Sequence, residues 1–158
     1  MKSNAAGKKL RMIIFSSLMI ALSVVLGYIS IDVAPNFKIS LANVPVMFTG
    51  MVLGPIFGLL VGIITDVLNF ILKPSGPFHF GFTLTNGLYG FLPGLFYLFL
   101  KKKASSFMSI KNIAVTVFVT EFIGSVVLYT YFLSSLYGGG FIAMFPIRLL
   151  KGIVMAVI

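Results

Sequence analysis

The sequence predicts an all-α membrane protein, a bundle of six transmembrane helices whose N-terminus lies in the cytoplasm. The first observation is the scarcity of charge: 59% of the 158 residues are hydrophobic, only 9% are charged, and the mean hydropathy is +1.11. A soluble domain carries roughly 25% charged residues to cover its wetted surface, so the solvent around this chain must be largely apolar. The second observation is a series of long apolar segments, and the third is the placement of basic residues between them.

Glycines, prolines and charged residues divide the chain into six apolar segments, which we expect to form one transmembrane domain over residues 1–158. The expected helices run over about Lys9–Ile31, Leu41–Leu53, Pro55–Leu72, Phe82–Leu100, Ser109–Leu136 and Ile142–Ile158. The last segment is still apolar at its final residue, so we expect helix six to be truncated at the C-terminus of this sequence.

The first helix follows a basic N-terminal stretch that resembles the start of a secretory signal. The apolar run continues from Met12 to Ile31 without an Ala-x-Ala-like cleavage site. It is long enough to cross a hydrocarbon core of about 30 Å, which favours a retained helix. Asp32 to Ser40, with Pro35 inside, is expected to be a polar loop.

The second segment, Leu41–Leu53, is the shortest. As a helix it would span only about 20 Å, less than the membrane core requires. Gly54-Pro55 ends it and begins the third helix. Two interpretations remain open: a short helix that helps to build a cavity, or a longer helix extended by residues of the preceding loop.

The later boundaries are marked by loop composition. Lys73–Gly81 is rich in proline and glycine and is expected to be a loop. The fourth helix should stop at Lys101–Lys103, and the three glycines within Tyr137–Phe141 indicate a turn before helix six.

The basic residues decide the orientation. With six spans and the N-terminus inside, the outer side holds only Lys38 and Lys73. The inner side holds eight, namely Lys2, Lys8, Lys9, Arg11, Lys101, Lys102, Lys103 and Lys111. Cytoplasmic loops of membrane proteins carry such an excess, and this placement accounts for the net charge of +9 better than nucleic-acid binding does.

Four ionisable residues fall inside the expected spans: Asp66, Glu121, Arg148 and Lys151. Each costs about 2.5–3.5 kcal/mol at a helix centre on insertion scales, so they indicate a polar site within the bundle. The alternative is that they pair with one another and serve only the fold.

Helix geometry places these groups mainly in the outer half of the membrane. Asp66 and Arg148 each lie about 9 Å below the outer surface, because six residues of helix span that distance. Lys151 lies on the Arg148 face and Asn69 on the Asp66 face, each three residues on. Glu121 is expected near mid-membrane. Arg148 suits a ligand carboxylate or ring oxygen, and either Asp66 or Glu121 would suit a ligand with N–H donors.

Aromatic residues near the outer loops, among them Phe78 and Phe82, would suit a planar ring ligand. Such residues also form ordinary interfacial belts, and that interpretation stays open. His79, the only histidine, is expected to line the pocket or face solvent rather than bind a metal. The predicted ligand-binding residues are therefore Asp66, Asn69, Phe78, His79, Phe82, Glu121, Arg148 and Lys151.

Enzyme motifs are missing from the sequence. There is no His-Glu-x-x-His, no nucleophile elbow and no phosphate-binding glycine loop with its Lys-Ser/Thr. The absence of cysteine excludes disulfides and cysteine zinc sites. We therefore predict neither catalytic nor metal-binding residues, no cofactor, and no ATP hydrolysis by this chain itself.

Helix one carries pairs of small residues four apart, Ser17 with Ala21 and Ser23 with Gly27. Small residues at this spacing allow membrane helices to approach closely, although such pairs also arise by chance.

The stretch Ser40–Gly62, with Asp66, Pro74-Ser-Gly-Pro and Gly81-Phe-Thr-Leu-Thr, resembles the substrate-binding S components of energy-coupling factor (ECF) vitamin transporters. It looks most similar to the folate-specific branch, over nearly the whole chain. The resemblance implies six helices, an outer vitamin pocket for folate, and a cell-membrane complex with one transmembrane scaffold subunit and two ATPase subunits. It also implies that Ser17 and Ala21 dock the scaffold.

Two positions depart from that pattern: Phe80 stands where proline is expected and Asn69 where glycine is common. Both touch the presumed pocket, so another vitamin such as riboflavin or pantothenate remains an alternative ligand. A small membrane enzyme and a pore-forming oligomer are rival interpretations outside the family.

Overall fold

The computed structural model describes residues 2–34, 37–73, 79–103, 110–128 and 131–132. Their elements, in chain order, are α1 (Lys2–Tyr28), β1 (Ile31–Ala34), β2 (Phe37–Ile39), α2 (Asn43–Leu53), α3 (Pro55–Leu72), α4 (Phe80–Lys103), α5 (Ile110–Glu121) and the π-helical segment η1 (Phe122–Leu128). Five α-helices and one short hairpin thus make up this part of the chain. The expected sixth helix, Ile142–Ile158, lies outside the described residues.

Two of these helices are long and apolar enough to cross a membrane by themselves, Ala6–Tyr28 within α1 and Pro55–Leu72. Large apolar side chains cover their outer surfaces; Ile14, Leu18 and Ile56, for example, are exposed. Such side chains would be costly in water, whereas lipid solvates them. The exposed surface therefore agrees with the composition in indicating membrane insertion.

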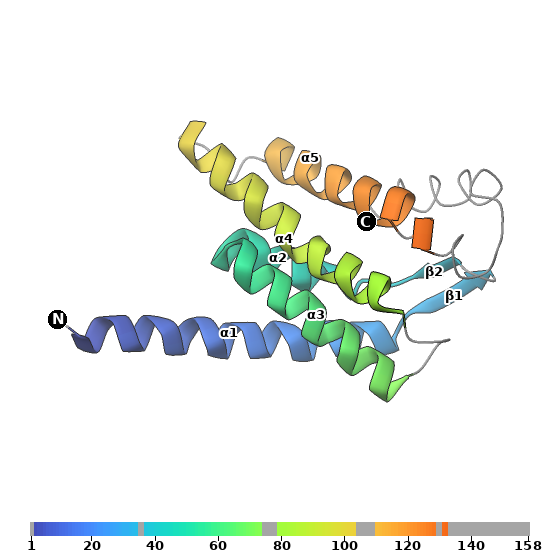
Figure 1. The fold of residues 1–158 in the computed structure, drawn as a ribbon, viewed down its shortest axis with the longest axis horizontal. Helices are drawn as coiled ribbons and strands as arrows, with labels where there is room; N and C mark the ends of the chain where they lie inside the picture. The colour runs from blue at the N-terminus through green and yellow to red at the C-terminus, as the bar shows by residue number, and fades with distance from the viewer. Residues whose placement is uncertain (1, 35–36, 74–78, 104–109, 129–130, 133–158) are drawn as a thin grey trace.

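The described helices alternate in direction, so the connections between them gather at two ends of the bundle (Figure 1). One end holds the hairpin, the end of α3 and the start of α4. The other holds the N-terminus, the α2–α3 junction, the end of α4 and the start of α5. The predicted inner basic residues all belong to this second end, so we call the hairpin end the outer end.

The segment Asp32–Ser40 corrects the expectation of an irregular loop. Most of it pairs as an antiparallel hairpin, with Ile31 opposite Ile39 and Asp32 opposite Lys38. The sequences Ile-Asp-Val-Ala and Phe-Lys-Ile alternate between apolar and polar residues, which is the period of a strand.

The short second helix is real. α2 begins at Asn43, directly after the hairpin and a turn, so loop residues do not extend it. Gly54 ends it with φ of 98°, a conformation that favours glycine, and Pro55 opens α3 at its first position. Of the two interpretations of this segment, the short helix is confirmed.

Glycines join α2, α3 and α4 backbone to backbone. We call this contact the glycine seam, and it comprises Gly50, Gly58, Gly62, Gly90 and Gly94. A Cβ at Gly58 would lie 2.3 Å from the Gly90 carbonyl oxygen, and one at Gly62 would lie 2.2 Å from the Asn86 carbonyl oxygen. Real Cβ atoms do not approach so closely, so only glycine fits. Membrane helices associate through this kind of close van der Waals contact.

Helix boundaries at the two ends of α4 and α5 differ modestly from the expectation. α4 starts at Phe80 and contains Pro93, which is fully buried. α5 starts at Ile110 and passes into η1 directly after Glu121. Residues beyond 128, apart from 131 and 132, are outside the described part of the chain.

Candidate ligand site in the outer half of the bundle

Asp66 is joined to α4 by a hydrogen bond: the Asn86 Nδ2 group donates to its Oδ1. Asp66 lies six residues before the end of α3 at Leu72, in the outer half of the helix as predicted. Both side chains are partly exposed in the described structure. The contact follows from the glycine seam, because Gly62 packs on the Asn86 carbonyl and Asp66 is one helical turn further out.

Two threonines beside this pair carry buried hydroxyls. Thr65 and Thr83 are each 4% exposed, and their Oγ1 atoms have no hydrogen-bond partner in the described structure. Thr49 and Thr85 differ, since each donates to the carbonyl four residues earlier in its own helix at 2.8 Å. The outer end of the α3–α4 contact is therefore polar on both helices.

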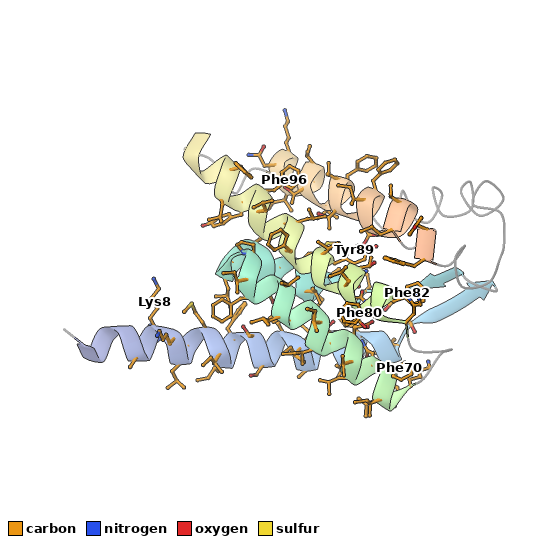
Figure 2. All side chains as sticks on the ribbon, viewed as in Figure 1. Lys8, Phe70, Phe80, Phe82, Tyr89 and Phe96 are labelled. Carbon is orange, nitrogen blue, oxygen red and sulfur yellow. The ribbon has the colours of Figure 1, made fainter. Side chains whose placement is uncertain are left out.

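Glu121 lies in a second polar contact, between α4 and α5. The Tyr89 hydroxyl donates to Glu121 Oε2 at 3.3 Å, and each residue is only 3% exposed. Gly124 makes room for the tyrosine ring, since a Cβ there would lie 2.6 Å from the ring carbon Cζ. Figure 2 labels Tyr89 on the side of α4 that faces α5.

Asn69 contacts a different helix from Asp66. A Cβ on Gly27 of α1 would lie 2.9 Å from Asn69 Oδ1, so the amide packs against α1. The two residues were expected on one face because residues three apart are neighbours on a helix surface. Their side chains nevertheless do not point in the same direction, because three residues are less than one full helical turn. In the fold that divergence is enough to direct Asp66 to α4 and Asn69 to α1.

His79 and Phe82 meet at the outer start of α4, where Figure 2 labels Phe82. His79 Nδ1 accepts a hydrogen bond from the Gly81 backbone N–H at 3.1 Å, which satisfies one of the free donors of the first helical turn. The rings of Phe82 and Phe132 each lie 5.5 Å from the His79 ring. This aromatic cluster ties α4 to the segment after η1.

The remaining predicted ligand residues, Phe78, Arg148 and Lys151, lie outside the described residues. Their convergence with Asp66 or Glu121 stays a prediction. Within the described ranges, no group of three His, Asp or Glu side chains could hold a metal ion.

Three contact residues were missed by the sequence analysis: Asn86, Tyr89 and Phe132. Asn86 and Tyr89 carried a readable signal, because a polar amide and a tyrosine in an apolar helix need hydrogen-bond partners. Phe132 carried none, since its role depends on a glycine at position 81 whose Cβ would lie 2.5 Å from the phenyl ring.

The two small-residue pairs of α1 face opposite ways. Ser17 and Ala21 are exposed, and Ser17 Oγ donates to the Ile13 carbonyl of its own helix at 3.0 Å. Ser23 is fully buried and donates to the Ala42 carbonyl, while Gly27 packs on Asn69. Only the first pair is therefore available to another protein.

Comparisons with known proteins place nearly all of the chain in one family. The family model described as "ECF transporter, substrate-specific component" matches residues 11–158. "Folate transporter FolT" of Clostridium novyi (strain NT) is 30% identical over 149 residues, which cover 94% of this chain and 83% of that protein. "Uncharacterized protein MG313" of Mycoplasma genitalium is 30% identical over 131 residues, 81% of this chain but 45% of its own length.

Solved structures agree in fold. A crystal structure of FolT bound with folic acid has a TM-score of 0.75 and 25% identity, covering 91% of this chain and 84% of that one. The S component of a bacterial ECF transporter has a TM-score of 0.67 at 23% identity, covering 94% and 90%, and shows the fold alone. The chain belongs to the substrate-specific S components of ECF transporters, membrane proteins that bind a transport substrate and are not enzymes.

Proposed function

We propose that this chain is a folate-specific S component that captures folate at the outer end of the bundle for ATP-driven uptake by partner subunits. The observation that carries the proposal is the likeness to FolT, in sequence along almost the whole chain and in structure to a folic-acid complex. That likeness favours folate over riboflavin or pantothenate.

The chemistry of the described residues supports a folate-like ligand. Folate combines a flat pterin, which carries N–H donors, with a glutamate tail that carries carboxylates. One carboxylate, that of Asp66 or that of Glu121, is the candidate hydrogen-bond acceptor for the N–H donors of the pterin. Arg148 and Lys151 supply cationic donors for the tail. His79 and Phe82 add aromatic surface at the outer rim.

In this proposal, residues 1–158 form one domain of six transmembrane helices, and residues 142–158 form the sixth helix. Uptake draws energy from partners, because the sequence has no nucleotide-binding motif. The proposed partners are a transmembrane scaffold subunit and two ATPase subunits. The exposed Ser17 and Ala21 face of α1 supports a close helix contact with the scaffold.

Identification of the ligand that co-purifies with the protein tests the proposal. The chain is expressed alone in a folate-containing host, extracted in mild detergent, denatured, and its released small molecules are identified by mass spectrometry. Folate or a reduced folate in near-stoichiometric amount is the expected result. Riboflavin or pantothenate in its place would reassign the substrate, and a Trp substitution pair that destroys the outer end, Thr83→Trp with Asn86→Trp, serves as the empty control.

A further inference from the structure

The described structure holds two membrane-embedded carboxylates with contrasting surroundings, Asp66 and Glu121. We infer that Asp66, positioned by Asn86, is the acceptor for the N–H donors of the ligand's heterocycle, and that Glu121 with Tyr89 is a joint between α4 and α5. The inference rests on the proposed function and refines it, because it selects one of the two candidate acceptors and adds Asn86 as a positioning residue.

Access distinguishes the two carboxylates first. Asp66 and Asn86 are partly exposed and lie toward the outer end of α3 and α4. Glu121 and Tyr89 are each 3% exposed, and the tyrosine ring is enclosed by Gly124. Asp66 thus keeps part of its surface accessible, whereas Glu121 is enclosed between α4 and α5.

Hydrogen bonding distinguishes them next. Asn86 Nδ2 donates a hydrogen bond to Asp66 Oδ1, whereas no described residue donates one to Asp66 Oδ2. One carboxylate oxygen is thus held while the other keeps its accepting capacity. A carboxylate held on one side needs less ordering when a ligand arrives, which raises affinity through preorganisation.

The anchor itself is rigid. Asn86 belongs to the stretch of α4 whose main chain packs on Gly62, where a Cβ would lie 2.2 Å from the Asn86 carbonyl oxygen. The glycine seam therefore holds the backbone of Asn86 in place against α3, and the Asn86 side chain extends from this fixed backbone. Asn86 acts on the ligand through Asp66, so it is a positioning residue.

This geometry selects a class of heterocycle. The 2-aminopyrimidinone edge of a pterin presents two adjacent N–H donors, which match the two carboxylate oxygens, because Oδ1 keeps a second lone pair beside its bond from Asn86. The corresponding edge of a flavin presents one N–H between two carbonyl oxygens, and these would be repelled by the negative charge. A site can exclude a competitor through such an unfavourable contact as well as by attracting the right ligand. The assignment thus predicts discrimination against flavins at Asp66.

The experiment measures Kd values of the purified full chain for folate and for a folate analogue in which hydrogen replaces the 2-amino group. Asp66→Asn keeps the shape and removes the charge. Because a charged hydrogen bond contributes about 1.5–3 kcal/mol, we expect this variant to raise the Kd for folate by about 10- to 150-fold. The wild type should prefer folate over the analogue by tens-fold, and the variant should lose that preference.

Asn86→Ala provides the second variant, for the case in which Asp66→Asn does not fold. Alone, it should raise the Kd for folate several-fold and weaken the folate-to-analogue preference. Where Asp66→Asn does fold, adding Asn86→Ala to it should change the Kd little, because both changes act on one group. Glu121→Gln with Tyr89→Phe is the matched control. It should lower the thermal midpoint while leaving the folate-to-analogue preference intact.

Three results would overturn the inference. They are an unchanged preference in both Asp66→Asn and Asn86→Ala, a preference lost only in the Glu121 and Tyr89 control, and additive effects of Asp66→Asn and Asn86→Ala. Failure of the wild type to bind folate at all contradicts the proposed function and the inference with it. Normal folate binding with any of the three results contradicts the inference alone.

Discussion

α4 packs against its neighbours on two sides by different means. Toward α2 and α3 it presents Gly90 and Gly94, and the backbones themselves touch. Toward α5 it presents Tyr89, whose ring fits against Gly124 and whose hydroxyl reaches Glu121 at 3.3 Å. The first contact has no adjustable atoms, whereas the second consists of side chains that can move and a π-helical turn. The comparison indicates a rigid α2–α3–α4 unit and a more adaptable α4–α5 contact.

A π-helical segment at the adaptable contact fits that difference. η1 begins at Phe122, immediately after the carboxylate that contacts Tyr89. π-helical turns are uncommon and occur frequently at functional sites. Among the described ligand candidates, Asp66 contacts the rigid side of α4, whereas the His79 and Phe82 cluster lies near the adaptable side.

The largest expected effect is from a bulky residue in the glycine seam. Gly58→Leu would drive a side chain into the Gly90 backbone, which cannot yield. Overpacking typically costs about 1–3 kcal/mol, and we expect a loss above that range, seen as failure to obtain monodisperse protein in size-exclusion chromatography. Gly7→Ala is the control, because a Cβ there meets nothing within 4 Å. Normal yield and melting of Gly58→Leu would show that the seam is not rigid.

A smaller effect is expected at the α4–α5 contact. Gly124→Ala places a Cβ 2.6 Å from the Tyr89 ring, but a side chain can shift where a backbone cannot. We expect folded protein with stability lowered by about 1–3 kcal/mol, measured by thermal unfolding. The double variant Gly124→Ala with Tyr89→Ala should lose less stability than the sum of the losses of the two single variants, because the added Cβ then no longer meets the tyrosine ring. A Gly124→Ala variant as damaged as Gly58→Leu would remove the proposed difference between the two contacts.

Loss of the tyrosine hydroxyl should cost less again. Tyr89→Phe keeps the ring against Gly124 and removes the donor to Glu121. We expect stability to fall by about 0.5–1.5 kcal/mol, the net contribution of one intramolecular hydrogen bond. Thermal unfolding of Tyr89→Phe beside Thr85→Val, which removes a hydroxyl bonded within its own helix, checks this prediction. Equal effects would mean that the Tyr89 hydroxyl contributes nothing specific.

The smallest effect on stability is expected on the exposed face of α1. Ser17→Trp with Ala21→Trp adds bulk where the described bundle makes no contact, so melting and folate binding should stay near wild type. ATP-dependent uptake and co-purification with the scaffold subunit should nevertheless be lost, because close helix packing is blocked. Ser23→Trp is the contrasting variant, since Ser23 is fully buried, and it should fail to fold. Retained uptake in the double variant would place the docking face elsewhere.

Composition and the long apolar segments were enough to predict a membrane helix bundle, because a chain this poor in charge has few soluble alternatives. Gly54-Pro55 correctly marked the boundary between α2 and α3, since that dipeptide acts locally. The hairpin was missed because a short strand pair near a proline looks like a loop. An alternation over three or four residues is too short to identify a strand by itself, because pairing depends on two segments meeting.

The site was predicted less completely than the fold. Asp66 was identified because a carboxylate in an apolar helix is rare, and its outer position followed from helix rise. Its partner Asn86 lies twenty residues away on another helix. The two residues meet only because the glycine seam fixes how α3 and α4 are aligned. Asn69 shows the opposite case, in which correct helical spacing still left open which neighbouring helix the side chain would meet.

Titration of the purified chain alone with folate tests the account most directly. Isothermal titration calorimetry of the wild type should show saturable one-to-one binding of folate, with riboflavin and pantothenate giving no heat and no competition. The same titration of Asp66→Asn should show markedly weaker binding of folate by a protein that still melts cooperatively. Tight riboflavin or pantothenate binding by a wild-type protein that ignores folate would contradict the account.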